Sequence, residues 1–195
     1  MDTREKIFEA ALIEFSENGY QRTTVRNICT RADVNIAAVN YHFFGKAELY
    51  ADIFEYLFKK DDRTKPKNSD DAKEYLRCWI RDHVDGQQQE SKFFAYKRKI
   101  MLKELSDSSD NLKELIEKYI KPNVEILFDC FRLCLPENTP EERVKTQCLL
   151  MVAKCIYFMI HTTSIELIAG EGFIGNNYEL ICSEIIRDTF SLFEN

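Results

Sequence analysis

The sequence predicts an all-α protein, on the evidence of its composition and its hydrophobic periodicity. The 195 residues include only 6 Gly and 4 Pro, too few for the closely spaced turns of a β-sandwich or barrel. Hydrophobic residues make up 45% of the chain and recur mostly at helical spacing, which provides a buried core and excludes intrinsic disorder. We therefore expect about nine helices, arranged as a small N-terminal domain and a larger C-terminal bundle.

Two short helices near the N-terminus are the most informative predicted elements. Thr24 is placed to cap a helix of about seven residues, and Asn35 is placed to cap a second one. Asp33 and Val34 form the tight turn between them. Two such helices separated by a short turn are typical of a helix-turn-helix, which we place at about residues 24–43.

The other predicted helices lie on both sides of a polar segment, DDRTKPKNSDD, which marks a surface connection. We therefore expect an N-terminal three-helix helix-turn-helix domain at 1–62 and a C-terminal helical-bundle domain at 68–195. Pro122 is expected to kink or split one helix, and Thr139 with Pro140 at the first helical position predicts a sharp helix start. These further helices are expected at residues 3–18, 45–57, 70–89, 92–105, 109–134, 140–168 and 177–193.

Charge is unevenly distributed along the chain. The net charge of −6 argues, as an average, against nucleic-acid binding. Residues 20–46 nevertheless carry four basic residues against one acidic residue, so the acidity lies outside the predicted helix-turn-helix. Seven Cys without C-x-x-C spacing favour a reduced, cytoplasmic protein. The longest apolar run, at 148–160, is too short for a membrane span, so no membrane partner is expected.

The segment TTVRNICTRADVNIAAVNYHFFGKAELY, residues 23–50, resembles the DNA-binding domain of the TetR family of transcriptional regulators. Asp33 stands where that family usually has Gly, and Asp tolerates turn conformations at small cost. The segment AAVNYHF, together with the later segments FFAYKRKIMLKEL and YIKP, is similar to the CecR branch of the family. The positions that carry the main resemblance are Gly19, Thr24, Ala32, Val34, Tyr41, His42, Phe43 and Lys46.

The resemblance implies a homodimeric repressor, not an enzyme, that a small-molecule effector releases from a palindromic double-stranded DNA operator. No cofactor or metal is expected. Asn40 has the chemistry to bond an adenine edge, and Ala37 or Ala38 to contact a thymine methyl. The expected DNA-binding residues are Thr24, Asn35, Ile36, Ala37, Ala38, Asn40, Tyr41, His42 and Lys46.

The predicted C-terminal domain has more aromatic residues than a lean helical core requires, so some are expected to line an effector cavity. The expected pocket residues are Trp79, Phe94, Phe128, Tyr157 and His161. The apolar helices at 140–168 and 177–193 are the expected dimer interface.

Two alternatives remain open at this stage. Cys130 and Cys134 lie at i, i+4 on one predicted helix, a spacing that a redox-responsive regulator could use. The aromatic cavity would also suit a helical small-molecule-binding protein or an enzyme. The sequence GEGFIG at 170–175 matches a dinucleotide-binding pattern, but too few residues follow it for a βαβ unit, so we interpret it as a loop.

Overall fold

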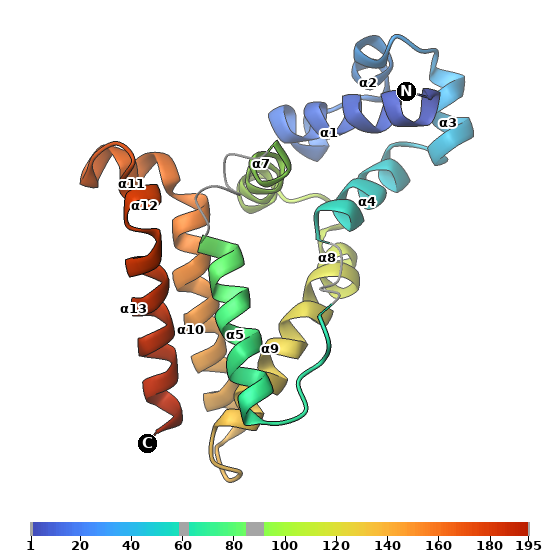
Figure 1. Cartoon of the computed structure of the whole chain (residues 1–195). Coiled ribbons are helices and arrows are strands. Elements are labelled where there is room, and N and C mark those ends of the chain that lie inside the picture. The colour runs from blue at the N-terminus through green and yellow to red at the C-terminus, as the bar shows by residue number, and fades with distance from the viewer. Residues whose placement is uncertain (1, 59–62, 85–91, 195) are drawn as a thin grey trace. The chain divides into compact units, whose positions relative to one another are not determined.

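The computed structural model describes residues 2–58, 63–84 and 92–194, and every regular element within them is a helix (Figure 1). The predicted all-α class is therefore confirmed. The chain divides into two compact units, the first made of residues 1–60 and 92–122 and the second of residues 61–91 and 123–195. Each unit has its own hydrophobic core.

The first unit begins with α1, Thr3–Arg22. A capping box fixes its start, because the Asp2 carboxylate accepts from the Glu5 N–H at 2.7 Å and the Glu5 carboxylate accepts from the Asp2 N–H at 2.9 Å. Helical dihedrals are interrupted at Gly19, where φ is 74° and ψ is 172°. That backbone conformation favours glycine, so the predicted end of the helix appears as a kink at this residue.

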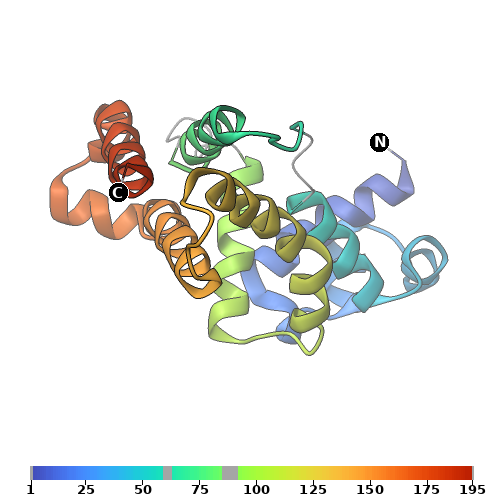
Figure 2. The ribbon, with the colours of Figure 1, turned by 90° about the horizontal axis from the view of Figure 1, so that it is seen from below.

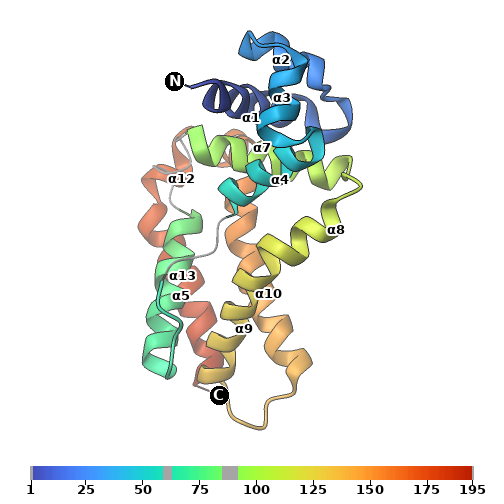
Figure 3. The ribbon, with the colours of Figure 1, turned by 90° about the vertical axis from the view of Figure 1, so that its right-hand side faces the viewer.

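Three helices follow at short spacing, α2 (Val25–Ala32), α3 (Ile36–Phe43) and α4 (Lys46–Leu57). They gather around α1 in both Figure 1 and Figure 3. The unit is completed by α7 (Lys92–Ser106), α8 (Leu112–Leu115) and a π-helical segment at Ile116–Ile120. Its fully buried side chains include Ile7, Phe15, Ile28, Val39, Leu49, Ile53 and Ile100.

Helix α7 packs against α1 and α4. The Tyr50 hydroxyl on α4 donates to the Glu104 carboxylate on α7 at 2.5 Å, and the same carboxylate accepts from the Ser109 N–H at 2.9 Å. Both Tyr50 and Glu104 are buried. The division of the chain at residues 62–68 stays a prediction, but the core of the first unit draws on residues 92–122 as well as on the N-terminal segment.

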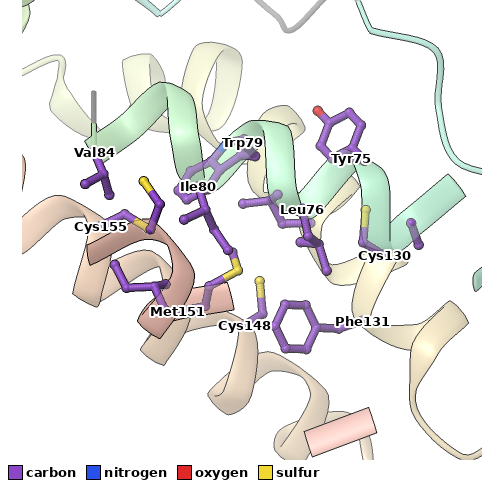
Figure 4. Close-up of a cluster of buried hydrophobic side chains, with 14 of the residues drawn as sticks. Tyr75, Leu76, Trp79, Ile80, Val84, Cys130, Phe131, Cys148, Met151 and Cys155 are labelled. Carbon is purple, nitrogen blue, oxygen red and sulfur yellow. The ribbon is translucent and has the colours of Figure 1, made fainter. Parts of the chain in front are cut away.

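The second unit is a bundle in which α5, α10 and α13 run side by side (Figures 1 and 3), and α9 adds residues to their shared core. Leu76 and Ile80 on α5 pack with Met151 on α10 and Phe131 on α9 in its core (Figure 4). The helices of this unit are α5 (Ser69–Val84), most of α9 (Lys121–Cys134), α10 (Glu141–Ile160), α11 (Thr162–Ala169), α12 (Phe173–Asn176) and α13 (Tyr178–Phe190), followed by a 3-10 turn at Ser191–Phe193.

The predicted single helix at 140–168 is wrong in its extent. Helix α10 ends at Ile160, and α11 turns away from it by 76°, as the orange segments of Figure 2 show. At the break, His161 has φ −96° and ψ 20°. The Thr162 hydroxyl donates to the carbonyls of Phe158 and Met159, the kind of local side-chain bond that competes with helix continuation.

Two helix boundaries around prolines also differ from prediction. Pro140 is the N-cap of α10, with extended ψ of 139°, and Glu141 is the first helical residue. The irregularity expected at Pro122 lies one turn earlier, in the π-helical segment at Ile116–Ile120. A proline ring crowds the carbonyl four residues before it, here that of Lys118, and the wider π turn accommodates that ring.

The end of the predicted helix at 70–89 lies partly outside the described residues, which give α5 as far as Val84. The GEGFIG segment contains the first three residues of the short α12, and no strand precedes it within the described residues. No single helix in the described part of the chain is long and apolar enough to cross a membrane, and α10 reaches that length and composition only together with the bent α11.

Candidate nucleic-acid interface

Helix α2 is fixed at its start by Thr24 and buried along one face. The Thr24 hydroxyl accepts from the Asn27 N–H at 3.1 Å, and it also lies against the Asn27 side chain. Ile28, Cys29 and Ala32 face the core of the first unit. Arg26 and Asn27, which directly precede these positions, are exposed on the outer face of the helix.

The turn after α2 uses a left-handed residue, as the sequence predicted for Asp33. Its φ is 54° and its ψ is 52°. Val34 donates its N–H to the Cys29 carbonyl at 3.1 Å, which closes the turn. Asp is among the side chains that accept this conformation at low cost, so replacing the usual glycine leaves the turn intact.

Helix α3 begins at Asn35, whose side-chain oxygen accepts from the Ala38 N–H at 2.9 Å. This N-cap was predicted, and it satisfies one of the free N–H groups at the helix start. Val39 and Phe43 are buried and hold α3 against the core. The opposite face exposes Ile36, Ala37, Asn40 and Tyr41, and leaves Ala38 and His42 partly buried.

Two aromatic residues, Tyr41 and His42, lie next to each other near the end of α3. Tyr41 is 80% exposed. The half-buried His42 ring packs edge-on against it, with ring centroids 5.0 Å apart. Tyr41 is thus available to a ligand on the exposed face, whereas His42 is partly committed to its neighbours.

Lys46, the first residue of α4, differs from a fully solvated phosphate-binding lysine. Its ammonium lies over the Tyr20 ring, 4.1 Å from the centroid. Partial burial lowers the pKa of Lys46. The aromatic face attracts the cation, so the ammonium is held over Tyr20 near the end of α1, where the Asp110 carboxylate also attracts it.

The basic charge of residues 20–46 is partly neutralised inside the first unit. The Arg31 guanidinium pairs with the Glu14 carboxylate at 2.7 Å and the Glu17 carboxylate at 3.1 Å. Arg22 and Arg26 are exposed. Arg26 and Asn27 were not predicted as site residues, although the inward spacing of Ile28, Cys29 and Ala32 already placed them on the outer face of α2.

The five predicted pocket residues are not gathered into one site by the structure. Trp79 and Phe128 are buried in the core of the second unit. Tyr157 is 50% exposed on α10 and its ring lies 4.8 Å from that of His161, at the α10–α11 break. Phe94 belongs to the first unit, on α7. An effector pocket made from them stays a prediction.

Of the two cysteines that a redox switch would use, Cys130 is buried and Cys134 is partly buried. Burial raises the pKa of Cys130 to about 12 and also raises the pKa of Cys134. The Cys134 thiol lies against Ser69 at 3.6 Å. Because the thiolate is the reactive form, neither side chain has the environment of a reactive cysteine. Within the described residues, no group of three or more His, Cys, Asp or Glu could hold a metal ion.

Comparisons with known proteins match both parts of the chain. Residues 7–53 match the bacterial regulatory proteins of the tetR family, and residues 79–192 match the C-terminal domain of the HTH-type transcriptional dual regulator CecR. The probable HTH-type transcriptional regulator YttP of Bacillus subtilis is 34% identical over 64 residues, which are 33% of this chain and 31% of YttP. The matched segment thus spans about a third of that relative.

Solved structures share the fold along nearly the whole chain. HlyIIR, a hemolysin II transcriptional regulator, superposes with a TM-score of 0.67 at 20% identity and covers 95% of this chain and 96% of its own. NalD, the secondary repressor of the MexAB-OprM multidrug efflux pump in Pseudomonas aeruginosa, gives 0.62 at 18% identity, with 97% and 94% covered. These likenesses concern the fold alone. The C-terminal match covers more than half of the sequence and the N-terminal match contains the helix-turn-helix, so the chain belongs to the TetR family of transcriptional regulators, with a C-terminal domain of the CecR type.

Proposed function

We propose that this protein is a cytoplasmic, homodimeric transcriptional repressor that binds a palindromic DNA operator through α3 and is released by a small-molecule effector. The observation that carries the proposal is the exposed face of α3. That helix is capped at Asn35 and anchored by Val39 and Phe43, yet it exposes small and hydrogen-bonding side chains in a row. A buried face with an exposed polar and small face is what a recognition helix in the major groove requires.

Within this proposal the exposed residues divide into two roles. Asn40 reads a base, because its amide can bond an adenine edge in bidentate fashion, and Ala37 and Ala38 allow close approach to thymine methyl groups. Ile36 borders the same surface. The phosphate-binding group is Thr24, Asn35, Tyr41, His42 and Lys46, to which we add Arg26 and Asn27 on the outer face of α2.

A dimer is proposed because two half-sites about 34 to 36 Å apart need two copies of α3. Exposed apolar side chains on α10, α11 and α13 support the interface expected there. Leu149, Leu150 and Tyr157 on α10 are each half-exposed or more, as is Leu180 on α13, and Leu167 and Ile168 on α11 are more than 80% exposed. Apolar groups in this number favour association with a second copy.

Effector release is proposed as a shift between two states of the dimer that differ in the spacing of their α3 helices. An effector binds more tightly to the state that does not fit the operator, and the difference sets the coupling free energy, in general about 1 to 3 kcal/mol. Repression, rather than activation, is proposed because the matched relatives include the probable acrEF/envCD operon repressor of Escherichia coli, which is 30% identical over 54 residues.

Selection of bound sequences from random double-stranded DNA by the purified full-length protein tests the proposal. Enrichment of a two-fold symmetric site is expected, and it would establish DNA binding, dimerisation and the operator together. Failure to enrich any sequence would contradict the proposal. Loss of DNA binding under oxidant, abolished by Cys130→Ala and Cys134→Ala, would instead favour the redox alternative.

A further inference from the structure

Phe44, the residue that follows α3, is exposed to an unusual degree for its type. Its side chain is 86% exposed, the largest exposed fraction among the large hydrophobic residues that the structure describes as exposed. Full exposure of an aromatic side chain sacrifices the free energy that burial would provide. It is therefore informative when the same residue also carries a backbone cost.

The backbone of Phe44 is left-handed, with φ 57° and ψ 9°. Asp33 and Phe44 are the non-glycine residues with positive φ in the described part of the chain. Asp tolerates this region, whereas a bulky residue in it is an outlier. The conformation is held because the Phe44 N–H donates to the Asn40 carbonyl at 3.1 Å, ending α3. Glycine or asparagine would fill this C-terminal cap without the same cost.

Phe44 also continues the exposed row of α3. Helical neighbours on one face recur three and four residues apart, and the exposed positions Ala37, Asn40 and Tyr41 lead directly to Phe44 at this spacing. The next residue, Gly45, has φ 128° and begins the passage to Lys46. The exposed Phe44 thus lies in the sequence between Tyr41 and Lys46, two residues of the proposed DNA-binding group.

We infer that Phe44 is a further DNA-contacting residue, which packs its ring against an apolar part of the operator at the end of α3. This inference rests on the proposed function. The apolar surfaces that a duplex offers there are the C5-methyl groups of thymine and the faces of the deoxyribose rings. Contact with either removes the ring from water, so an aromatic side chain is favoured at a position where folding alone favours glycine or asparagine.

The test uses the full-length protein and the duplex that the wild type selects from random DNA. Phe44→Asn keeps a residue suited to the left-handed conformation but removes the apolar ring. We expect its affinity for that duplex to fall about tenfold per half-site, equivalent to about 1.4 kcal/mol. Its melting temperature should be equal to that of the wild type or higher, because the backbone cost is relieved.

A matched control places the same chemical change on another surface. Leu105 on α7 is 70% exposed and lies in the same unit, so Leu105→Asn should leave DNA affinity unchanged.

Replacing thymine by deoxyuridine, one position of the selected duplex at a time, identifies the group that Phe44 contacts. If one replacement lowers the affinity of the wild type but not that of Phe44→Asn, the ring contacts the methyl group of that thymine. If Phe44→Asn binds more weakly than the wild type but no replacement changes the wild-type affinity, the ring contacts a deoxyribose. Both outcomes support the inference.

Unchanged affinity of Phe44→Asn for the selected duplex would overturn the inference, as would a loss traced to a changed oligomeric state. A lower melting temperature with proportionate loss of folded protein would likewise assign Phe44 a structural role. If the wild type selects no duplex at all, the proposed function fails; if it selects one that Phe44→Asn binds equally well, only this inference fails.

Discussion

The hydrogen bond between Tyr50 and Glu104 should contribute more to stability than any exposed pair in the first unit. The hydroxyl and the carboxylate are 2.5 Å apart, with Tyr50 1% and Glu104 5% exposed. Tyr50→Phe removes the donor and leaves a carboxylate oxygen buried without it, although the Ser109 N–H still serves the other oxygen. A hydrogen bond to a charged group contributes about 1.5 to 3 kcal/mol, so we expect unfolding free energy to fall by about 2 to 3 kcal/mol.

Tyr119→Phe is the matched control for this prediction. The Tyr119 hydroxyl donates to Glu55 at 3.1 Å, and Glu55 is exposed, so water can replace the lost donor. Its loss should cost about 0.5 kcal/mol. Chemical denaturation gives the unfolding free energy of both variants. Adding Glu104→Gln and the double variant with Tyr50→Phe completes a cycle that gives the coupling free energy between Tyr50 and Glu104. A cost for Tyr50→Phe no larger than that of Tyr119→Phe, or a coupling near zero, would refute this account of the α4–α7 contact.

Four further outcomes are expected. Asn35→Ala should lower the unfolding free energy by about 1 kcal/mol in chemical denaturation, because the cap of α3 is lost, while Asn35→Ser retains it. Asn40→Ala should relax preference at one base pair by about 1 to 3 kcal/mol in competition binding; an equal loss at every position would contradict base reading. Lys46→Ala should weaken binding to all sequences alike. In titrations at several salt concentrations, the slope of log affinity against log salt concentration should become shallower by about 1 per protomer. Burial raises the pKa of Cys148 to about 12. The contribution of Cys148 to the unfolding free energy is therefore complete below about pH 9 and is lost as pH rises toward 12. In this range the unfolding free energy of Cys148→Ala, measured by chemical denaturation, should fall less steeply with pH than that of the wild type, by up to about 1.4 kcal/mol per pH unit.

The helix-turn-helix was predictable because its signals are local. Thr24 and Asn35 cap the helices that follow them, and Asp33 takes the left-handed turn, so each boundary is decided by a side chain and its nearest backbone. The end of α10 was not predictable in the same way. Apolar periodicity continues through His161, and the break depends on how the Thr162 hydroxyl bonds the preceding carbonyls.

The candidate site was predictable in part. The exposed row on α3 follows from the caps and from the inward Val39 and Phe43. The aromatic residues of a pocket could not be chosen from the sequence, because Trp79 and Phe128 fill a core in the same way that cavity residues would line a void. The left-handed backbone of Phe44 could not be predicted from the sequence, because only the backbone dihedrals of the structure reveal it.

The positive charge that residues 20–46 offer to DNA is smaller than the count of basic residues in the sequence indicates. Arg31 contributes to the basic total of residues 20–46, but its guanidinium is neutralised by Glu14 and Glu17 of α1. Arg22, Arg26 and Lys46 are left for phosphates in each protomer. Because non-specific binding depends mainly on the number of phosphates neutralised, so few cations would hold non-matching DNA weakly. Under the proposed function, discrimination then depends on how well Asn40 and its neighbours fit the bases.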